Sequence, residues 1–291
     1  MSGETTSGSL AAALPEIVAD ARIVHEYEGT WRRTTDVKKQ TPNTGLNWTE
    51  FALDKKTAQG ITETTTNNNF QQLSGTLISV EPQMTQIIMK ITDRSKRKLA
   101  SVVISKFGSL AGNAMARMQD EDYLALFATF STACQPGTGQ PLSFGHISAA
   151  ANRIPSNATE PSMAEIFTVL HGYQVKDIQD EVLAGVGTYT IPTGLTEETF
   201  RKGFKGTVAD TNTFVDGNIA INSTPDARGA VHSREAVVAA IGMEVKTKTD
   251  YDLYFGGGAE VASLVNEYAF VERSAGNWAF SMLSDATAPT S

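Results

Sequence analysis

The sequence predicts an α+β fold, because one long helical pattern and one long strand pattern occupy separate parts of its 291 residues. Large apolar residues recur at three- and four-residue steps between about residues 95 and 130, as on one face of a helix. Apolar and polar residues alternate from Met243 to Phe255, as along a strand. Shorter helix and strand patterns lie between these two segments. With 41% hydrophobic residues the chain can bury a core, so whole-chain disorder is excluded.

Composition excludes several classes of protein. No run of 18 apolar residues occurs, so no membrane span is expected, and residues 1–9 lack the basic and apolar parts of a secretory signal. The single cysteine, Cys134, excludes an internal disulfide framework and a multi-cysteine zinc site, and fits a reducing cell interior.

Charge is unevenly distributed along the chain. Residues 1–110 carry 13 Lys and Arg against 11 Asp and Glu, whereas residues 111–291 carry 11 against 21. The net charge of −8, without a basic stripe, argues against tight DNA binding. The asymmetry either reflects solubility alone or lets the front half of one copy attract the back half of another.

The N-terminal quarter is unusually polar. A short helix is expected from Pro15 to about Tyr27, after a flexible start. Residues 28–76 contain only nine large apolar side chains, two of them the tryptophans Trp31 and Trp48. Such a stretch cannot build its own core. It is either a disordered linker or an extended arm that becomes ordered against a neighbour, and the tryptophans favour the arm.

The middle of the chain should hold two strands and the long helix. Residues 77–92 predict strands interrupted at Pro82. The following helix, about 36 residues over 95–130, would reach roughly 54 Å, with Gly108 and Gly112 permitting a kink or close packing. Its basic start (residues 94–98) and acidic end (119–122) both oppose the helix dipole. They are either solvated charges or pairing sites between subunits.

The second half predicts short elements and then strands. Ser162–Glu165 is a capping-box sequence, so a helix is expected to run from there to Gly172. Further short helices are expected at Thr196–Gly203 and, capped by Ser233, at 234–241 before Gly242. After the long strand, Gly256–Gly258 should turn the chain. Residues 268–272 and 278–283 should form a hairpin about Ser274–Asn277.

A search for catalytic or ligand-binding motifs finds no convincing site, and no cofactor or metal is expected. The four histidines lack metal-ligand spacing, and the glycine clusters lack the context of a phosphate-binding loop. Asp120, Glu121 and Asp122 could be paired carboxylates, but consecutive helical positions point apart. An enzyme using these or Asp250 and Asp252 remains an alternative of a different class, as does a monomeric adhesin or binding module.

The order of these parts resembles the Hong Kong 97-type capsid fold of tailed phages. The resemblance rests on the polar stretch, the strand ending Ile91-Thr-Asp-Arg94, the long helix ending Met115-Ala-Arg-Met-Gln-Asp-Glu-Asp122, and the segment Gly229–Gly242. It covers essentially the whole chain, and the layout rather than any single motif carries it. The implied function is a structural, non-enzymatic subunit of an icosahedral head shell that encloses double-stranded DNA.

The resemblance also implies a division of the chain. Residues 1–35 would be the N-terminal arm, 36–76 the E-loop, 77–134 the peripheral domain with its spine helix, 135–242 the axial domain, and 243–291 further peripheral strands. Contacts between subunits are expected at Trp31, Trp48, Phe51, Arg94, Lys96, Arg97, Lys98, Asp120, Glu121 and Asp122. The Lys and Asn residues of the E-loop could be cross-linked, as in some relatives, but solvated lysines are the simpler interpretation.

The expected partners are other copies of the chain in hexamers and pentamers, a portal, a decoration protein and packaged DNA contacted non-specifically, with no membrane. No extra scaffolding segment precedes residue 10, so a separate scaffolding protein is implied. Assembly would take place in the host bacterial cytoplasm and the product would be a virion. The alternative within the same fold is an encapsulin-like nanocompartment that encloses cargo enzymes.

Overall fold

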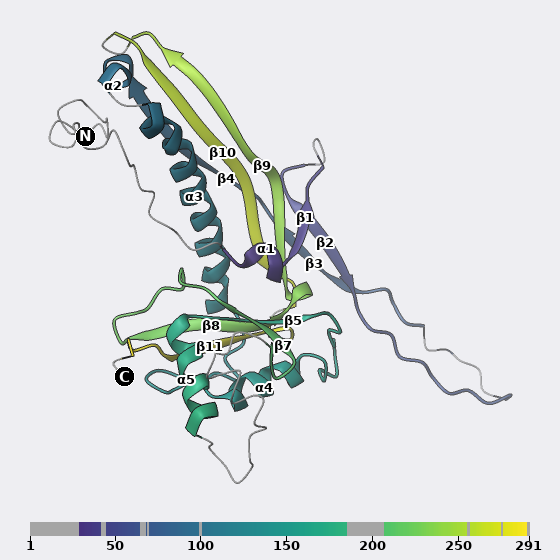
Figure 1. Cartoon of the computed structure of the whole chain (residues 1–291). Helices are drawn as coiled ribbons and strands as arrows, with labels where there is room; N and C mark the ends of the chain where they lie inside the picture. The colour runs from purple at the N-terminus through teal and green to yellow at the C-terminus, as the bar shows by residue number, and fades with distance from the viewer. Residues whose placement is uncertain are drawn as a thin grey trace.

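The computed structural model describes residues 29–41, 45–64, 68, 70–98, 101–184, 207–254, 257–274 and 276–289, with only the backbone of 98, 101–107 and 182–184. Figure 1 shows two layered regions and a projecting two-stranded ribbon. The helices expected at Pro15–Tyr27 and Thr196–Gly203 lie outside the described residues. No helix in the described part of the chain combines the length and apolar character that a membrane span needs.

The upper region is a four-stranded sheet in the order β1-β9-β10-β4. Its long members are β4 (Gln83–Thr92), β9 (Val237–Asp252) and β10 (Ala259–Glu272). β10 pairs antiparallel with both β9 and β4. The short strand β1 (Asp36–Lys39) runs parallel to β9 and covers it only from Val238 to Ile241. The upper two thirds of β9 therefore form an edge of the sheet.

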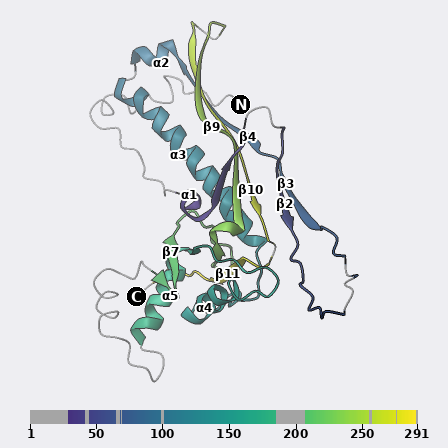
Figure 2. The same cartoon turned by 90° about the vertical axis from the view of Figure 1, so that its right-hand side faces the viewer.

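A long helix lies along this sheet (Figures 1 and 2). It is α3 (Ser101–Ala125), followed by the 3-10 turn η1 (Leu126–Ala128), and a separate short helix, α2 (Asp93–Lys98), precedes it. The helix predicted over about 95–130 is thus confirmed from Ser101 to Ala125, whereas its first residues belong to α2. Ala111 and Met115 of α3 pack on Leu264 of β10, with Ile87 and Met89 of β4 beside them. The alternation in β4 turns those two side chains toward the helix.

The lower region is built on a five-stranded sheet in the order β11-β8-β5-β7-β6. Its strands are β5 (Ile166–Leu170), β6 (Thr207–Val208), β7 (Thr211–Val215), β8 (Asp226–Ser233) and β11 (Ala279–Asp285). The helices α4 (Phe144–Arg153) and α5 (Gly172–Ala184) pack against it. Ile147, Ile178, Val231 and Met282 are buried in the shared core. This region has a complete hydrophobic core of its own.

A second core joins the two regions where the long helix ends. Tyr123, Phe127 and Phe130 are buried there together with Val237 and Ala239 of β9. The short helix α1 (Trp31–Thr34) adds the indole of Trp31 to the same cluster. The rings of Tyr123 and Phe127 meet edge to face at 5.0 Å, a favourable aromatic geometry. The end of the helix is thereby anchored in both regions.

The projecting ribbon consists of β2 (Trp48–Leu53) and β3 (Gly75–Val80), paired antiparallel. Figure 1 shows it pointing away from both regions. The prediction of strands on both sides of Pro82 is confirmed, but β3 and β4 belong to different sheets. The polar stretch from 28 to 76 is therefore divided: its beginning enters the body of the molecule and its later part forms the ribbon.

Three sequence predictions in the second half are wrong. Residues 166–170 form β5 rather than a helix, because Ile, Phe, Thr and Val favour a buried strand. The Ser233 cap is real, since its side chain accepts a bond from the Glu235 amide, but the turn η2 (Arg234–Ala236) ends after three residues. Gly242 then continues β9. The expected hairpin about Ser274–Asn277 is also wrong, because β10 pairs with β9 and β4 whereas β11 pairs with β8.

Candidate interaction surfaces

The β2–β3 ribbon has one apolar face that the chain itself does not cover. Phe51 pairs with Leu77 and Leu53 with Gly75, so these side chains lie on the same face. Phe51, Leu53 and Leu77 are 55%, 60% and 64% exposed. A Cβ on Gly75 would lie 2.2 Å from the Ala52 carbonyl oxygen and 2.8 Å from the Phe51 ring, so only glycine fits under that ring. We call Phe51, Leu53 and Leu77 the ribbon patch.

Beyond the strands the ribbon continues as two irregular segments. Asp54 donates its backbone N–H to Ser74 at 3.0 Å, and the Lys56 ammonium donates to the Gln72 carbonyl at 2.6 Å. Ile61, Phe70 and Leu73 are 61%, 91% and 72% exposed. Exposed apolar side chains on an extended, self-bonded segment are typical of a surface that is covered by a partner.

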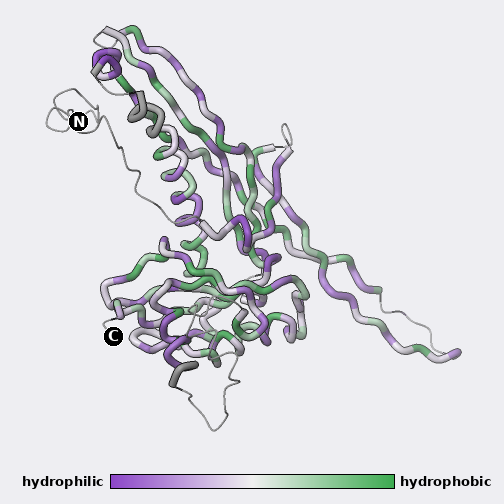
Figure 3. Tube along the Cα trace, in the orientation of Figure 1, coloured by the Kyte–Doolittle hydropathy of each residue, from purple (hydrophilic) through white to green (hydrophobic). Residues whose placement is uncertain are grey.

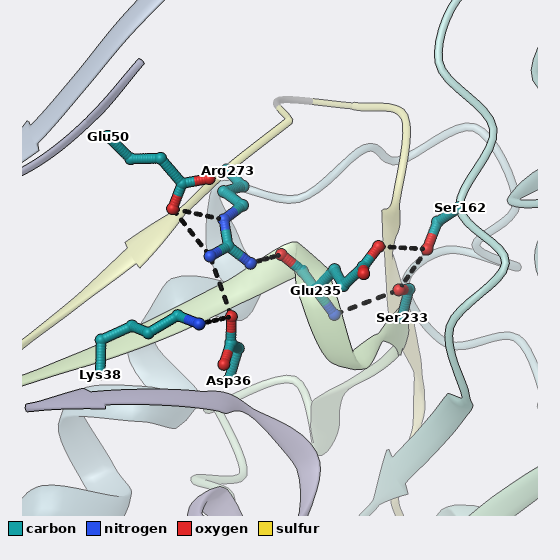
Figure 4. Close-up of polar contacts among 7 residues, drawn as sticks. All are labelled: Asp36, Lys38, Glu50, Ser162, Ser233, Glu235 and Arg273. Carbon is teal, nitrogen blue, oxygen red and sulfur yellow. Dashed lines mark hydrogen bonds and ion pairs between the residues drawn. The ribbon is translucent and has the colours of Figure 1, made fainter. Parts of the chain in front are cut away.

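The opposite face of the ribbon is fixed to the body by Arg273, at the end of β10 (Figure 4). Its Nη2 donates to Glu50 of β2 at 2.8 Å and to Asp36 at 2.9 Å, and its Nη1 donates to the Glu235 carbonyl at 3.1 Å. The guanidinium side chain is only 11% exposed. Burial alone would lower the pKa of Arg273, but the bonds to Glu50 and Asp36 raise it overall. The charged guanidinium thus joins the ribbon, β1 and β10.

A crevice of about 730 Å³ separates the base of the ribbon from the lower region. Leu53 and Ile78 line it on the ribbon side, and the loop from Thr159 to Pro161 lines the other side. Arg273 and Ser274 close its inner end. The ribbon therefore contacts the body through Arg273 and again just beyond β2, where the Lys55 ammonium donates to the Ala158 carbonyl at 3.4 Å.

The top of the molecule carries the predicted basic residues, and Figure 3 shows α2 as hydrophilic. Arg94 and Arg97 are exposed. Lys96 forms an ion pair with Glu260 of β10, and the side chain of Lys98 lies outside the described residues. Beside α2, Leu253 and Tyr254 at the β9–β10 turn are 75% and fully exposed. This tip combines positive charge with unburied apolar surface.

The predicted acidic residues point in different directions. Asp120 is fully buried, Glu121 is exposed and pairs with Arg117 at 3.4 Å, and Asp122 accepts a bond from the Tyr268 hydroxyl at 2.5 Å. The expectation that they cannot converge on one ion is confirmed. Asp120 precedes the buried Tyr123 and Leu124 by three and four residues, so helical spacing places it on the inner face.

The two tryptophans of the polar stretch have different surroundings. Trp31 is 4% exposed and meets Phe270 edge to face at 5.4 Å, so it belongs to the chain's own core and is not an anchor on an arm. Trp48 is half-buried at the start of β2. The predicted contacts between subunits at Trp31 and Asp120 are therefore wrong, because both side chains are buried within the chain, whereas Trp48 and Phe51 are accessible to a partner.

Sequence reasoning missed Leu53 and Leu77 of the ribbon patch and the link through Arg273. The alternation of Phe51 and Leu53 across one face was a usable signal. Arg273 lies 223 residues from Glu50, and no local pattern connects them.

The residues that could serve an enzyme do not form a site in the described part of the chain. Asp252 pairs with Lys90 at 2.8 Å. His232 is fully buried and its pKa falls to about 4 because burial disfavours its charge. No group of three or more His, Cys, Asp or Glu side chains in the described residues is arranged to hold a metal ion.

Solved structures of bacteriophage capsids share this architecture. The chain resembles a capsid chain of the Helicobacter pylori bacteriophage KHP30 with a TM-score of 0.71 and 10% identity, covering 98% of this chain and 99% of that one. It resembles the cyanophage P-SCSP1u capsid with a TM-score of 0.68 and 12% identity, covering 99% and 97%. The bacteriophage PhiM1 mature capsid gives 0.67 at 10% identity, covering 93% and 91%.

No family model and no curated protein matches the sequence. At such identities the structural likeness shows the fold alone. The chain has an α+β capsid-protein fold of the Hong Kong 97 type, as the order of its parts predicted.

Proposed function

We propose that this chain is the structural, non-enzymatic subunit that assembles into the icosahedral head shell of a tailed bacteriophage. The observation that carries the proposal is the ribbon patch, on a chain whose fold matches phage capsid chains over nearly their whole length. Three large apolar side chains exposed together on one face of a two-stranded ribbon are typical of a surface that a partner covers. In the proposal that surface belongs to a second copy.

The proposed division of the chain is kept in outline, although its boundaries after residues 76 and 242 fall inside β3 and β9. Residues 1–35 are the N-terminal arm, 36–76 the E-loop, 77–134 and 243–291 the peripheral domain, and 135–242 the axial domain. The sheet pairing supports the interruption of the peripheral domain, since β4 pairs with β10. It also shows exceptions: β1 of the E-loop pairs with β9, and β11 pairs with β8 of the axial domain.

Contacts between copies are proposed at the ribbon, at the tip and on the outer face of α3. The residues are Trp48, Phe51, Arg94, Lys96, Arg97, Lys98, Glu121 and Asp122. A shell built of many modest contacts is strong because closed symmetry repeats each one. Hexamers and pentamers, a separate scaffolding protein, a portal, a decoration protein and non-specific contact with packaged DNA complete the proposed partners. The product is a virion assembled in the host cytoplasm.

An encapsulin-like compartment is the second reading of the same fold and is not favoured. The structures reported above come from phage particles. Neighbouring genes discriminate the two: terminase and portal genes accompany a phage shell, whereas a cargo enzyme with a terminal docking peptide accompanies an encapsulin.

Electron microscopy of the purified chain under assembly conditions tests the proposal. Closed shells of uniform size are expected from the wild-type chain. Phe51→Ser should reduce their yield at least tenfold with unchanged monomer stability, whereas Thr49→Ala, an exposed polar position on the same ribbon face, should assemble normally. Wild-type chains that stay monomeric in every condition, with or without scaffolding protein, would contradict the proposal.

A further inference from the structure

Two buried carboxyl groups meet where the N-terminal segment, the long helix and the lower sheet come together. Asp120 lies on α3 and Asp216 follows β7, and neither is exposed. Thr30 donates its backbone N–H to Asp120 Oδ1 at 2.9 Å and its hydroxyl to Asp216 Oδ2 at 3.0 Å. Asn218 donates its side-chain amide to Asp120 Oδ2 and its backbone N–H to Asp216 Oδ1, both at 2.9 Å. Thr30 and Asn218 thus each bridge both carboxyl groups.

Among the residues that the structure describes, no basic side chain forms an ion pair with Asp120 or Asp216, and none contributes to the pKa of Asp120. Burial is the largest influence on the pKa of Asp120 and raises it. The side chain of Asp216 raises it as well, through its charge and a hydrogen bond, whereas the hydrogen bonds from the Asn218 side chain and the Thr30 backbone lower it. Tyr123 faces the pair from α3, and its hydroxyl lies 2.7 Å from Nε2 of His232. His171 faces Asp216 from the start of α5, but burial lowers its pKa. Two ionised carboxylates in contact without a cation repel each other.

We propose that Asp120 and Asp216 share one proton, and that this shared proton holds the N-terminal segment, α3 and the β7–β8 connection together. The proton resides on one carboxyl and is donated to the other, so the pair carries a single negative charge that four protein donors surround. Loss of the proton leaves two buried charges in contact, and their desolvation and mutual repulsion outweigh the stronger bonds that Thr30 and Asn218 donate to a charged carboxylate. This inference concerns the single chain and does not depend on the proposed shell.

The pair of carboxyl groups joins segments that lie far apart in the sequence, and we call this arrangement the junction. Thr30 is 90 residues from Asp120 and 186 from Asp216, and Asn218 is 98 residues from Asp120. A Cβ on Gly29 would lie 2.6 Å from Asp120 Oδ1, so the chain can approach the carboxyl only with glycine at that position. Opening the pair releases the segment that leads to the N-terminus from the end of the long helix.

The direction of the pH effect follows from the two states. Burial raises the pKa of Asp120 from 3.8 to about 7 in the closed junction. In the open junction the carboxyl is solvated and its pKa returns to its ordinary value. Opening therefore releases a proton between about pH 4 and pH 7, and the opening equilibrium rises about tenfold per pH unit in that window. Above about pH 7 both states are ionised and the dependence ends.

Hydrogen exchange of the Thr30 and Asn218 amides tests the proposal on the unassembled full-length chain, because both N–H groups donate to the pair. After correction for intrinsic exchange rates, protection should fall by about a hundredfold from pH 5 to pH 7. Asp120→Asn, whose amide imitates the protonated carboxyl, should abolish the fall. Asp180→Asn makes the same charge change at an exposed carboxylate of α5 and should retain it.

A second measurement is decided on the wild-type chain, so it remains valid even if a variant fails to fold. Infrared spectra of the wild-type chain at pH 6 should show the C=O band of a protonated carboxyl group that disappears by about pH 8. The band should be missing in Asp120→Asn and present in Asp180→Asn. Equal protection at pH 5 and pH 7, or a wild-type chain without a protonated carboxyl at pH 6, overturns the proposal.

Discussion

The lower sheet and the β2–β3 ribbon use similar residues in opposite ways. In β8 and β5 all but one side chain of each strand is buried. In the ribbon, the large apolar residues Phe51, Leu53 and Leu77 are mostly exposed. The lower sheet has helices and a second core around it, whereas the ribbon has the body on one side only, where Glu50 bonds to Arg273 and Lys55 to the Ala158 carbonyl.

This difference separates residues that fold the chain from residues that remain available to a partner. A substitution in the lower core removes contacts that already exist in the single chain. A substitution on the ribbon patch removes contacts that form only on association.

The same substitution should have opposite consequences in the two regions. Phe280→Ala, in the core of the lower sheet, should lower the free energy of unfolding by about 3–5 kcal/mol. Phe51→Ala should lower it by less than about 0.5 kcal/mol and should reduce shell yield instead. Urea denaturation and electron microscopy measure the two effects. If Phe51→Ala unfolded the monomer, the ribbon patch would be needed for folding of the single chain, which contradicts this distinction between the two regions.

Asp120 and His232, two buried titratable groups, should change the free energy of global unfolding with pH in opposite directions. The raised pKa of Asp120, about 7, makes stability fall as pH rises from about 4 to 7, because the folded state keeps its proton longer. The lowered pKa of His232, about 4, makes stability rise from about pH 4 to 6.5, because the unfolded state binds that proton.

Removing the titration of Asp120 should therefore reveal the pH dependence that His232 contributes to stability. In Asp120→Asn the free energy of unfolding should rise with pH more steeply than in the wild-type chain, by up to about 1.4 kcal/mol per pH unit. Denaturation midpoints between pH 4.5 and 6.5 measure the difference. Parallel pH profiles for the two proteins would show that Asp120 titrates normally.

Releasing the root of the ribbon should alter its orientation more than the stability of the chain. Arg273→Gln removes the ion pairs to Glu50 and Asp36, whose side chains are 35% and 25% exposed, and should cost about 1–3 kcal/mol. Distances between spin labels on the ribbon and the lower region should broaden. Arg32→Gln, at the exposed pair with Glu244, should leave both quantities nearly unchanged.

Salt should have the smallest effect. If the excess of acidic residues after position 110 guides association, raising the ionic strength to about 1 M should slow assembly several-fold, since screening shortens the range of the charges. Light scattering follows the rate. Assembly that proceeds equally fast at both salt concentrations would restrict the charge asymmetry to a role in solubility.

The sequence predicted the elements that have a strong period of their own. The long helix, the strands beside Pro82 and the strand after Met243 all carry regular patterns, and all three are present. It failed where neighbours decide the structure. The capping-box sequence at Ser162 does not begin a helix, because the β-branched residues that follow it form the strand β5. The pairing of β11 could not be predicted, because its partner β8 lies more than 45 residues earlier in the chain.

The candidate surfaces show the same division. Phe51 and the basic residues of α2 could be found from local composition. Trp31 was assigned to an arm because it lies in a polar stretch, yet Phe270 and Tyr123 bury it from distant parts of the chain. The pairing of Asp120 with Asp216 joins residues that no local pattern relates.

The incomplete cover of β9 by β1 has a consequence for solubility. From Gly242 to Asp252 no described strand pairs with the outer edge of β9, so its peptide groups could template another strand. Lys246, Lys248 and Asp250 are exposed along that edge, and charged side chains discourage such pairing. Replacing Lys246 and Lys248 with valine should remove this protection, so that the exposed edge of β9 promotes fibrous aggregation.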